Sequence, residues 1–112
     1  MKVLVTGGAG FIGSHVVDGY LAEGLDVIVV DDLSRGAREN LAPGVCFYQV
    51  DIRDRAALGS IFEKEQPDLI NHHAAQIDVR QAVREPAFDA ETNILASIHL
   101  LELAIQHGVK RF

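Results

Sequence analysis

Four glycines fall within seven positions near the start of the chain, in the stretch VTGGAGFIG at residues 5–13. Glycine loses more conformational freedom on folding than any other residue, so this cluster requires a structural reason. An apolar run at residues 2–6 precedes the glycines, and apolar residues at helical spacing follow them. In this context Gly8-x-Gly10-x-x-Gly13 predicts a strand, a tight turn and a helix whose first turn binds a dinucleotide.

Each glycine of the pattern has an expected role. An early glycine permits the tight turn, the middle one lets a pyrophosphate approach bare backbone, and the last lets the helix lie close to the sheet. Free amides at the helix N-terminus then supply positive potential for the phosphates. The alternative is that the glycines form a bare structural turn with no ligand.

The charge balance limits the classes of partner. The chain carries 16 acidic and 10 basic residues and a net charge of −6. Nucleic-acid-binding domains usually present a basic face, so we expect no nucleic-acid partner. An anionic ligand would therefore be held locally, by backbone dipoles in place of a basic surface.

Four short segments rich in aliphatic or β-branched residues predict strands, at residues 2–6, 26–31, 45–51 and 68–73. Three of them are continuous apolar runs, as in parallel strands covered on both faces. Helical stretches separate the strands, which predicts an α/β protein with a Rossmann-type three-layer α/β/α fold. We expect a parallel sheet of four to five strands in the order 3-2-1-4, with the start of strand 5 at residues 110–112. The ligand crevice would lie between strands 1 and 4.

Three helices are expected from apolar spacing and from their end signals. Asp54 is a candidate N-cap for the second helix, which must end before Pro67, and the third begins just after Pro86 and ends at Gly108. Segments 33–44 and 74–86 are expected to be irregular. The expected apolar faces are Ile12, Val16, Val17, Tyr20 and Leu21 in the first helix, Leu58, Ile61 and Phe62 in the second, and Phe88, Leu95, Ile98, Leu101 and Ile105 in the third.

An acidic residue stands where the dinucleotide pattern requires one. Asp31 ends the second predicted strand, 18 residues after Gly13, where its carboxylate can accept hydrogen bonds from both adenosine-ribose hydroxyls of NAD. A 2′-phosphate would be repelled there, although Arg35 and Arg38 leave NADP as a less favoured cofactor. The alternative is that Asp31 and Asp32 form a solvated strand end.

At this point the chain resembles the extended short-chain dehydrogenase/reductases, and within them the NAD-dependent epimerases and dehydratases of nucleotide sugars. The resemblance covers nearly all 112 residues. The matching segments are the glycine motif VTGGAGFIGSH, the ribose-binding segment DDLS at 31–34, the adenine-side DIRD at 51–54, HHAAQ at 72–76 and NILAS at 93–97, with Ala96 in place of the usual glycine.

The resemblance implies NAD as cofactor, a nucleotide sugar as the substrate of the intact enzyme, and a set of cofactor-binding residues. These are Gly7, Gly10, Phe11, Ile12 and Gly13 at the pyrophosphate, Asp31 and Asp32 in the ribose segment, Asp51 and Ile52 at the adenine, and Ala74 and Ala75 against the middle of the cofactor. Two alternatives stay open, namely that Asp51 is a strand-end acid and that Phe11 and Ile12 only pack at the start of the helix.

The family's catalytic Tyr-x-x-x-Lys pair does not occur in these residues. The two tyrosines, Tyr20 and Tyr48, are followed four positions later by Gly24 and Ile52. We therefore expect residues 1–112 to be a partial NAD(P)-binding Rossmann domain, an N-terminal fragment with no catalytic residue and no activity of its own. The competing interpretations are a fragment of a dehydratase or decarboxylase of the same family and a Rossmann scaffold that binds no ligand.

Several other functions find no support in the sequence. His72 and His73 are adjacent in a predicted strand and point to opposite faces, so we expect no metal site. Cys46 has no partner for a disulfide and is expected to be a small core residue. Neither a signal-peptide core nor a run of membrane-spanning length is present, so a cytoplasmic protein with no membrane partner is expected.

The truncated sheet leads to one further expectation. Strand 4 would lie at an unprotected edge, and the helix at residues 88–106 would lose part of the sheet that it covers. We therefore expect self-association through the strand 4 edge or through this helix.

Overall fold

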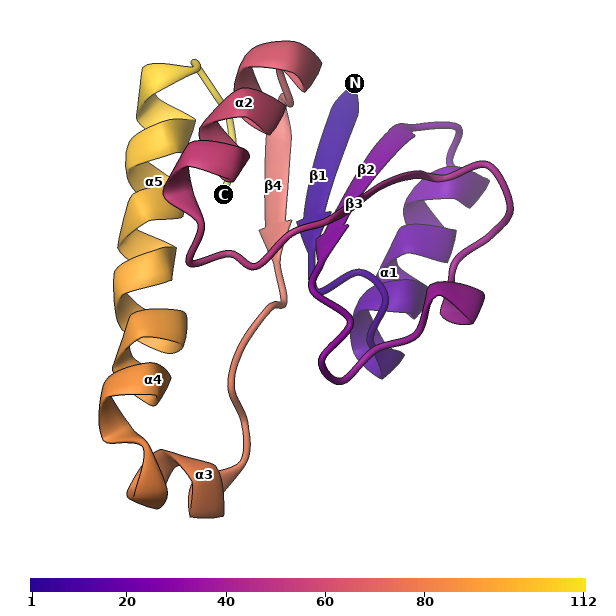
Figure 1. The fold of residues 1–112 in the computed structure, drawn as a ribbon. Helices are drawn as coiled ribbons and strands as arrows, with labels where there is room; N and C mark the ends of the chain where they lie inside the picture. Colours follow the sequence, from indigo (N-terminus) through magenta and orange to yellow (C-terminus); the bar gives the residue numbers. More distant parts are fainter.

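The computed structural model describes residues 1–112, which form one parallel sheet in the order β3-β2-β1-β4 (Figure 1). The predicted strand order is therefore confirmed. The strands are β1 Lys2–Thr6, β2 Asp26–Asp31, β3 Cys46–Gln49 and β4 Leu69–His72, of which the last two are shorter than expected. Thr6 pairs in register with Val30 on β2 and with His72 on β4, so the carboxyl ends of these three strands lie at the same edge.

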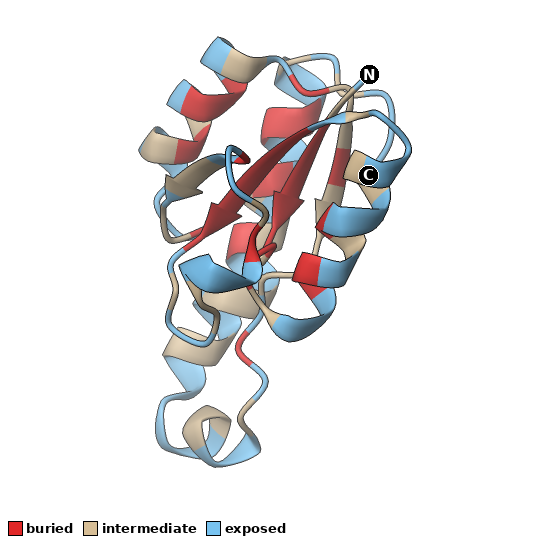
Figure 2. Ribbon diagram, turned by 90° about the vertical axis from the view of Figure 1, so that its right-hand side faces the viewer, coloured by how far each residue is buried: buried red, intermediate tan, exposed pale blue.

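Helices cover both faces of the sheet, which confirms the three-layer fold (Figure 1). The helical segments are α1 Phe11–Ala22, the 3₁₀ turn η1 Arg38–Asn40, α2 Arg55–Glu65, α3 Val79–Arg84, α4 Pro86–Ala90, the π-helical η2 Glu91–Leu95 and α5 Ala96–Gln106. Val17 of α1 packs against Val3, Val5 and Val29 on one face, while α2 and α5 pack on the other. Figure 2 shows the central strands buried between these layers.

The capping signals in the sequence correctly predicted where α2 begins and ends and where α4 begins. The Asp54 side chain accepts a hydrogen bond from the Ala57 amide and so begins α2. That helix ends at Gln66, which adopts a left-handed conformation with φ 48° just before Pro67. Pro86 occupies the first turn of α4, where its missing amide removes no helical hydrogen bond.

The predicted apolar stripe of the third helix is largely exposed, as expected for a helix that lacks part of the sheet it would cover, but it is not the face that packs on the core. The side chains that face the core are Ala96, Leu100, Leu103 and Ala104, whereas Leu95, Ile98, Leu101 and Ile105 are exposed and Phe88 is half-buried. The π-helical segment η2 changes the helical phase between Phe88 in α4 and the residues of α5, so Phe88 does not continue the stripe formed by Ile98, Leu101 and Ile105. Two alanines on the true face also allow close approach to the sheet, and a search for large apolar residues overlooks them.

Three smaller expectations also need correction. Ile12 lies outside the buried face of α1, which consists of Gly13, Ser14 and Val17. Segment 74–86 is not wholly irregular, because Asp78 caps α3 by accepting hydrogen bonds from the amides of Arg80 and Gln81. Cys46 is exposed and not a core residue, because β3 forms an edge of the sheet.

The end of the chain begins a fifth strand beside β4. Arg111 forms a parallel bridge with Leu69, and its carbonyl accepts a hydrogen bond from the Ile70 amide at 3.0 Å. The Lys110 amide donates to the Asp68 carbonyl at 2.8 Å. The expected start of strand 5 is therefore present, and it covers part of the outer edge of β4. No helix in the structure is long and apolar enough to cross a bilayer.

The corrected face of α5 makes a direct stability prediction. Replacing the fully buried Leu100 with alanine leaves a cavity, which should lower the free energy of unfolding by about 2–5 kcal/mol. Ile105→Ala on the exposed face should change it by less than about 0.5 kcal/mol. Urea denaturation followed by circular dichroism measures both, and a larger loss for Ile105→Ala would show that the face is assigned wrongly.

Candidate dinucleotide site

The glycine loop after β1 and the loop after β4 meet at the carboxyl edge of the sheet. Gly7 has φ 67°, and a Cβ atom there would lie 2.7 Å from the Ala74 amide nitrogen. A Cβ on Gly13 would clash with the Gly7 carbonyl oxygen, and one on Gly8 would lie 2.8 Å from Cγ1 of Val29. The turn therefore depends on Gly7, while Gly8 and Gly13 allow close packing of backbone, helix and sheet.

Gly10 differs from the other glycines of the loop because the protein leaves space beside it. A Cβ there would meet only the Gly7 carbonyl oxygen, at 3.3 Å. Gly10 is the N-cap of α1 and provides no side-chain cap, so the first-turn amides have no acceptor within the helix. Such amides bind anions well, and an added side chain at Gly10 would occupy the space in front of them.

Phe11 and Ile12 flank this helix start without packing into the core. Their side chains are 82% and 67% exposed, so the alternative that they only pack at the helix start is not supported. The Phe11 ring contacts His15 edge-on, with ring centroids 5.3 Å apart. Both apolar side chains therefore border the open end of the glycine loop.

The Ala9 peptide fixes the glycine loop to the segment after β2. Its amide donates to Oδ2 of Asp31 at 2.9 Å. Its carbonyl accepts hydrogen bonds from the Ala37 amide at 3.1 Å and from Nδ2 of Asn40 at 2.8 Å. A Cβ on Gly36 would lie 2.6 Å from the same carbonyl oxygen, so this segment must come close to the loop. The sequence interpretation missed Gly36 and Asn40, because their segment has no helical or strand periodicity.

Asp31 is buried and hydrogen-bonded, so it is not a solvated strand end. Only 8% of the residue is exposed, and Oδ1 accepts the Leu33 amide at 2.8 Å. Each carboxylate oxygen has a second lone pair, so both can still accept a hydrogen bond from a ligand hydroxyl. Asp32 does fit a solvated end, since it is exposed and binds the amide and hydroxyl of Ser34.

The loop after β3 carries Asp51 and Ile52, the residues predicted to lie at the adenine. Hydrogen bonds and charge from the Arg53 guanidinium hold the pKa of Asp51 below its usual range, despite partial burial. The same guanidinium lies 3.6 Å from Glu91 and stacks over the Phe88 ring, which ties this loop to the helix beyond β4. The Ile52 side chain is buried in the core, so only its backbone is available to a ligand.

The Thr6 hydroxyl anchors the loop after β4. It accepts hydrogen bonds from the amides of His73 and Ala74, both at 3.1 Å. The His73 amide is shared with the Thr6 carbonyl oxygen, 3.0 Å away. With both amides directed at the hydroxyl oxygen, the Thr6 proton is placed to donate to Nδ1 of His72, 2.6 Å away. Ala74 is thereby held against Gly7, while the neighbouring Ala75 is exposed.

The same reasoning assigns the proton positions beyond His72. With Nδ1 accepting from Thr6, Nε2 carries the ring proton and donates to the Ser97 hydroxyl at 3.1 Å. Ser97 donates in turn to the Asn93 carbonyl at 2.9 Å. Every member of this chain is satisfied when His72 is neutral, and burial, with the neighbouring His73, holds the pKa of His72 below its ordinary value.

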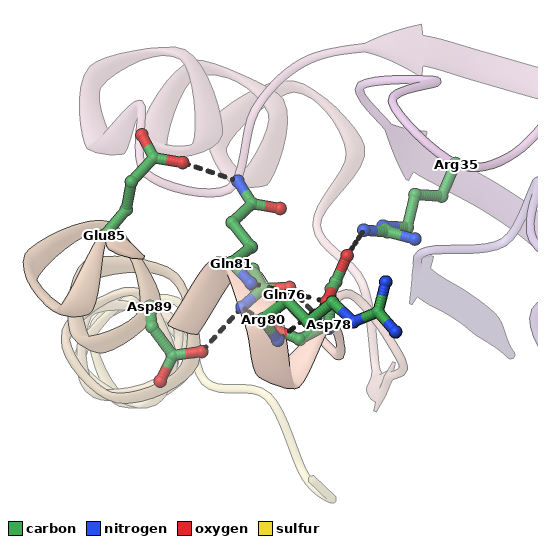
Figure 3. A network of polar contacts seen from close by, with 7 residues as sticks. All are labelled: Arg35, Gln76, Asp78, Arg80, Gln81, Glu85 and Asp89. Carbon is green, nitrogen blue, oxygen red and sulfur yellow. Dashed lines mark hydrogen bonds and ion pairs between the residues drawn. The ribbon is translucent and has the colours of Figure 1, made fainter. Parts of the chain in front are cut away.

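Asn93 and Gln76 connect the irregular part of the loop to η2. The Asn93 side chain accepts the Gln76 amide and donates to the Gln76 carbonyl, both at 2.8 Å. The Gln76 side chain donates to Oδ1 of Asp89 at 2.8 Å and accepts the Asp78 amide (Figure 3). π-helical turns often occur at functional sites, so the position of Asn93 in η2 is consistent with a role of this segment in the site.

A family model described as the NAD dependent epimerase/dehydratase family matches residues 3–112. The chain belongs to this family. The resemblance found in the sequence is therefore confirmed, and its motifs lie at the ends of β1, β2, β3 and β4 and in η2 and the start of α5. Gly7 lies against Ala74 and the Ala9 amide is hydrogen-bonded to Asp31, whereas the Asp51 carboxylate pairs with Arg53 of its own loop.

Members of the epimerase/dehydratase family named UDP-glucose 4-epimerase are similar to nearly the whole chain. The protein from Mycolicibacterium smegmatis is 43% identical over 116 residues, which cover 99% of this chain and 37% of that protein. The one from Lacticaseibacillus casei is 42% identical over 111 residues, covering 99% and 34%. The chain thus spans about a third of the length of these relatives.

Solved structures of the family superimpose closely. The Thermus thermophilus UDP-glucose 4-epimerase in complex with NAD has a TM-score of 0.93 and 49% identity, covering 97% of this chain and 35% of that one. The Thermotoga maritima UDP-glucose 4-epimerase with UDP-glucose has a TM-score of 0.95 and 53% identity, covering 98% and 36%.

The His72 network predicts a pH dependence of stability. The unfolded chain takes up the His72 proton near pH 6.5, while the folded chain takes it up at lower pH. Between these values the unfolded state binds more protons, so the free energy of unfolding must fall as the pH drops below about 6.5. Asp51 acts in the same direction, but below about pH 4.

Denaturant titrations from pH 7.5 to 5 should show this loss in the wild type. His72→Gln cannot titrate but can still accept from Thr6 and donate to Ser97, so its slope between pH 6.5 and 5 should be smaller. The matched control is His15→Gln, which changes an exposed histidine of α1 and should keep the wild-type slope. Equal slopes in the wild type and His72→Gln would contradict the network.

Proposed function

We propose that this chain binds NAD as the N-terminal part of a nucleotide-sugar epimerase of the UDP-glucose 4-epimerase type. The observation that carries the proposal is the clamped Ala9 peptide between the buried Asp31 carboxylate and the open backbone at Gly10. This arrangement offers acceptors for a ribose diol beside free amides for a pyrophosphate, which are the two polar parts of the adenosine end of NAD.

The remaining site residues take the roles that the family resemblance implies. Asp51 and the backbone of Ile52 would border the adenine, and Phe11 and Ile12 the pyrophosphate. Ala74 and Ala75 are small where the middle of the dinucleotide would pass. Their value would lie in leaving room, because alanine has no polar side-chain group.

NAD, when bound, would supply the hydride acceptor and donor for reversible oxidation at C4 of a nucleotide sugar. These residues would hold and orient the cofactor, and none of them is a candidate proton donor for the sugar hydroxyl. We therefore propose that residues 1–112 alone do not turn over a nucleotide sugar. The relatives named UDP-glucose 4-epimerase favour epimerisation over dehydration or decarboxylation as the parent reaction.

A calorimetric titration tests the cofactor site. We expect the wild-type chain to bind NAD with a Kd of roughly high micromolar to millimolar, because the nicotinamide half would have few partners. Gly10→Val should abolish binding, since its side chain would fill the space before the first-turn amides. Asp31→Ala should weaken binding by removing the ribose acceptors.

The matched control is Gly19→Val, also in the α1 region but at a position where an added Cβ meets nothing within 4 Å. It should bind NAD as the wild type does. Equal affinity for Gly10→Val and Gly19→Val would refute the site, and no binding by the folded wild type would refute the proposed function.

We also propose that the chain self-associates through the exposed apolar side of α5. Leu95 at the end of η2 and Ile98 and Leu101 in α5 are between 43% and 47% exposed, and neighbouring exposed apolar side chains of this kind often mark an interaction surface. The outer edge of β4 is the weaker candidate, because Arg111 already pairs with part of it. An exposed free thiol at Cys46 suits a reducing compartment, so we place the protein in the cytoplasm.

Sedimentation equilibrium over a hundredfold range of concentration tests the association. We expect a dimer or larger assembly at the upper end, and Leu101→Lys should shift the equilibrium toward monomer because it places a charge within the apolar side. Gln106→Lys, exposed near the end of the same helix, is the control that should not. An ideal monomer at every concentration would contradict the proposal.

A further inference from the structure

Two arginines follow β2 close to Asp31, at the place where folds that bind NADP use an arginine to hold the 2′-phosphate. In this structure both are already engaged. The Arg38 guanidinium lies 4.6 Å from the centre of the Phe47 ring. Arg35 forms an ion pair with Asp78, with its Nη2 3.4 Å from Oδ2 (Figure 3). Each guanidinium would therefore have to leave its present partner to meet a phosphate on the ribose.

The Arg35–Asp78 pair joins two loops on opposite sides of the glycine loop. Arg35 follows β2 and Asp78 follows β4, and these strands flank β1 on either side. Gly36, next to Arg35, packs against the Ala9 carbonyl, so the arginine begins at the rim of the crevice. The ion pair therefore holds the Arg35 guanidinium on the β4 side of the glycine loop, away from the end of β2.

Asp78 is held in place for this contact. Its Oδ1 atom accepts the amides of Arg80 and Gln81, and its own amide donates to Oε1 of Gln76 at 2.6 Å. The two backbone donors, with a smaller effect of Arg35, hold the pKa of the Asp78 carboxyl below its usual range. The carboxylate is thus charged at neutral pH and fixed by its cap, with Oδ2 left for Arg35.

We propose that Asp78 is a positioning residue that favours NAD over NADP by keeping Arg35 from the ribose 2′ position. This inference rests on the proposed NAD-binding function. Asp31 alone would repel a 2′-phosphate, but a nearby free arginine could offset that repulsion. Engagement of Arg35 by Asp78 weakens this compensation, so the discrimination involves both loops.

The expected effect is modest because the pair is exposed. The two side chains are 53% and 36% exposed, and ion pairs of this kind change an equilibrium by at most about fivefold. Salt screens such a pair, so the effect should be largest at low ionic strength.

The test compares the Kd values for NADP and NAD in the wild type, Asp78→Asn, Arg35→Ala and the double variant. Asparagine is as good an N-cap as aspartate, so α3 should stay formed while the charge is lost. We expect Asp78→Asn to lower the NADP-to-NAD ratio of Kd values by about two- to fivefold. In the Arg35→Ala background the same change should leave the ratio unaltered.

Asp54→Asn is the matched control, because it makes the same substitution at the N-cap of α2 and has no contact with Arg35. It should keep the wild-type ratio. An unchanged ratio in Asp78→Asn with NAD binding retained would overturn the specificity role alone. A decrease that persists in the Arg35→Ala background would also overturn it, because loss of a general charge would then be the cause. No NAD binding by the wild type would instead refute the proposed function, and this inference with it.

Discussion

The candidate site depends on one peptide group, that of Ala9, which is bonded on both sides. Its amide donates to Asp31 at the end of β2, and its carbonyl accepts from Ala37 and Asn40 in the segment that follows. Together with the hydrogen bond from the Gly7 amide to the Val30 carbonyl, these bonds fix the glycine loop relative to the Asp31 carboxylate. The central strand β1, buried from Val3 to Thr6, makes the arrangement possible, because it pairs with both β2 and β4 and aligns their carboxyl ends.

A second anchor fixes the opposite wall, and it begins at the last residue of β1. The Thr6 hydroxyl holds the loop after β4 by accepting hydrogen bonds from two amides, and it donates a hydrogen bond to Nδ1 of His72. The chain of hydrogen bonds continues through the Ser97 hydroxyl to the Asn93 carbonyl in the π-helical segment η2. The Asn93 side chain in turn binds the backbone of Gln76. The glycine loop and the loop after β4 are therefore both held by hydrogen bonds within the protein. No basic side chain is needed to hold them in place. An acidic protein can in this way present a site for an anionic ligand.

Sequence signals were sufficient where they are local. Continuous apolar runs, the glycine cluster and the cap at Asp54 predicted the strand order, the turn and the start of α2. They were insufficient where contacts are distant in sequence. Gly36 and Asn40 matter only because their segment packs on Ala9, and no periodicity marks them. The core-facing side of α5 was missed because two of its four buried residues are small alanines, which a search for large apolar residues overlooks. The glycine with the left-handed backbone conformation is Gly7, one residue before the pattern Gly8-x-Gly10-x-x-Gly13 from which the turn was predicted.

The central claim is that a dinucleotide binds at the clamped glycine loop, and amide chemical-shift mapping by NMR tests it most directly. Titration of the ¹⁵N-labelled chain with NAD should shift the amides of the loop from Gly7 to Gly13 and those around Asp31 and Ala74 as one group, with a common Kd. Amides around Tyr20 and Arg111, which line the open pocket beside β4, should not move. Shifts centred on that pocket, or no shifts in the glycine loop at saturating NAD, would contradict the account.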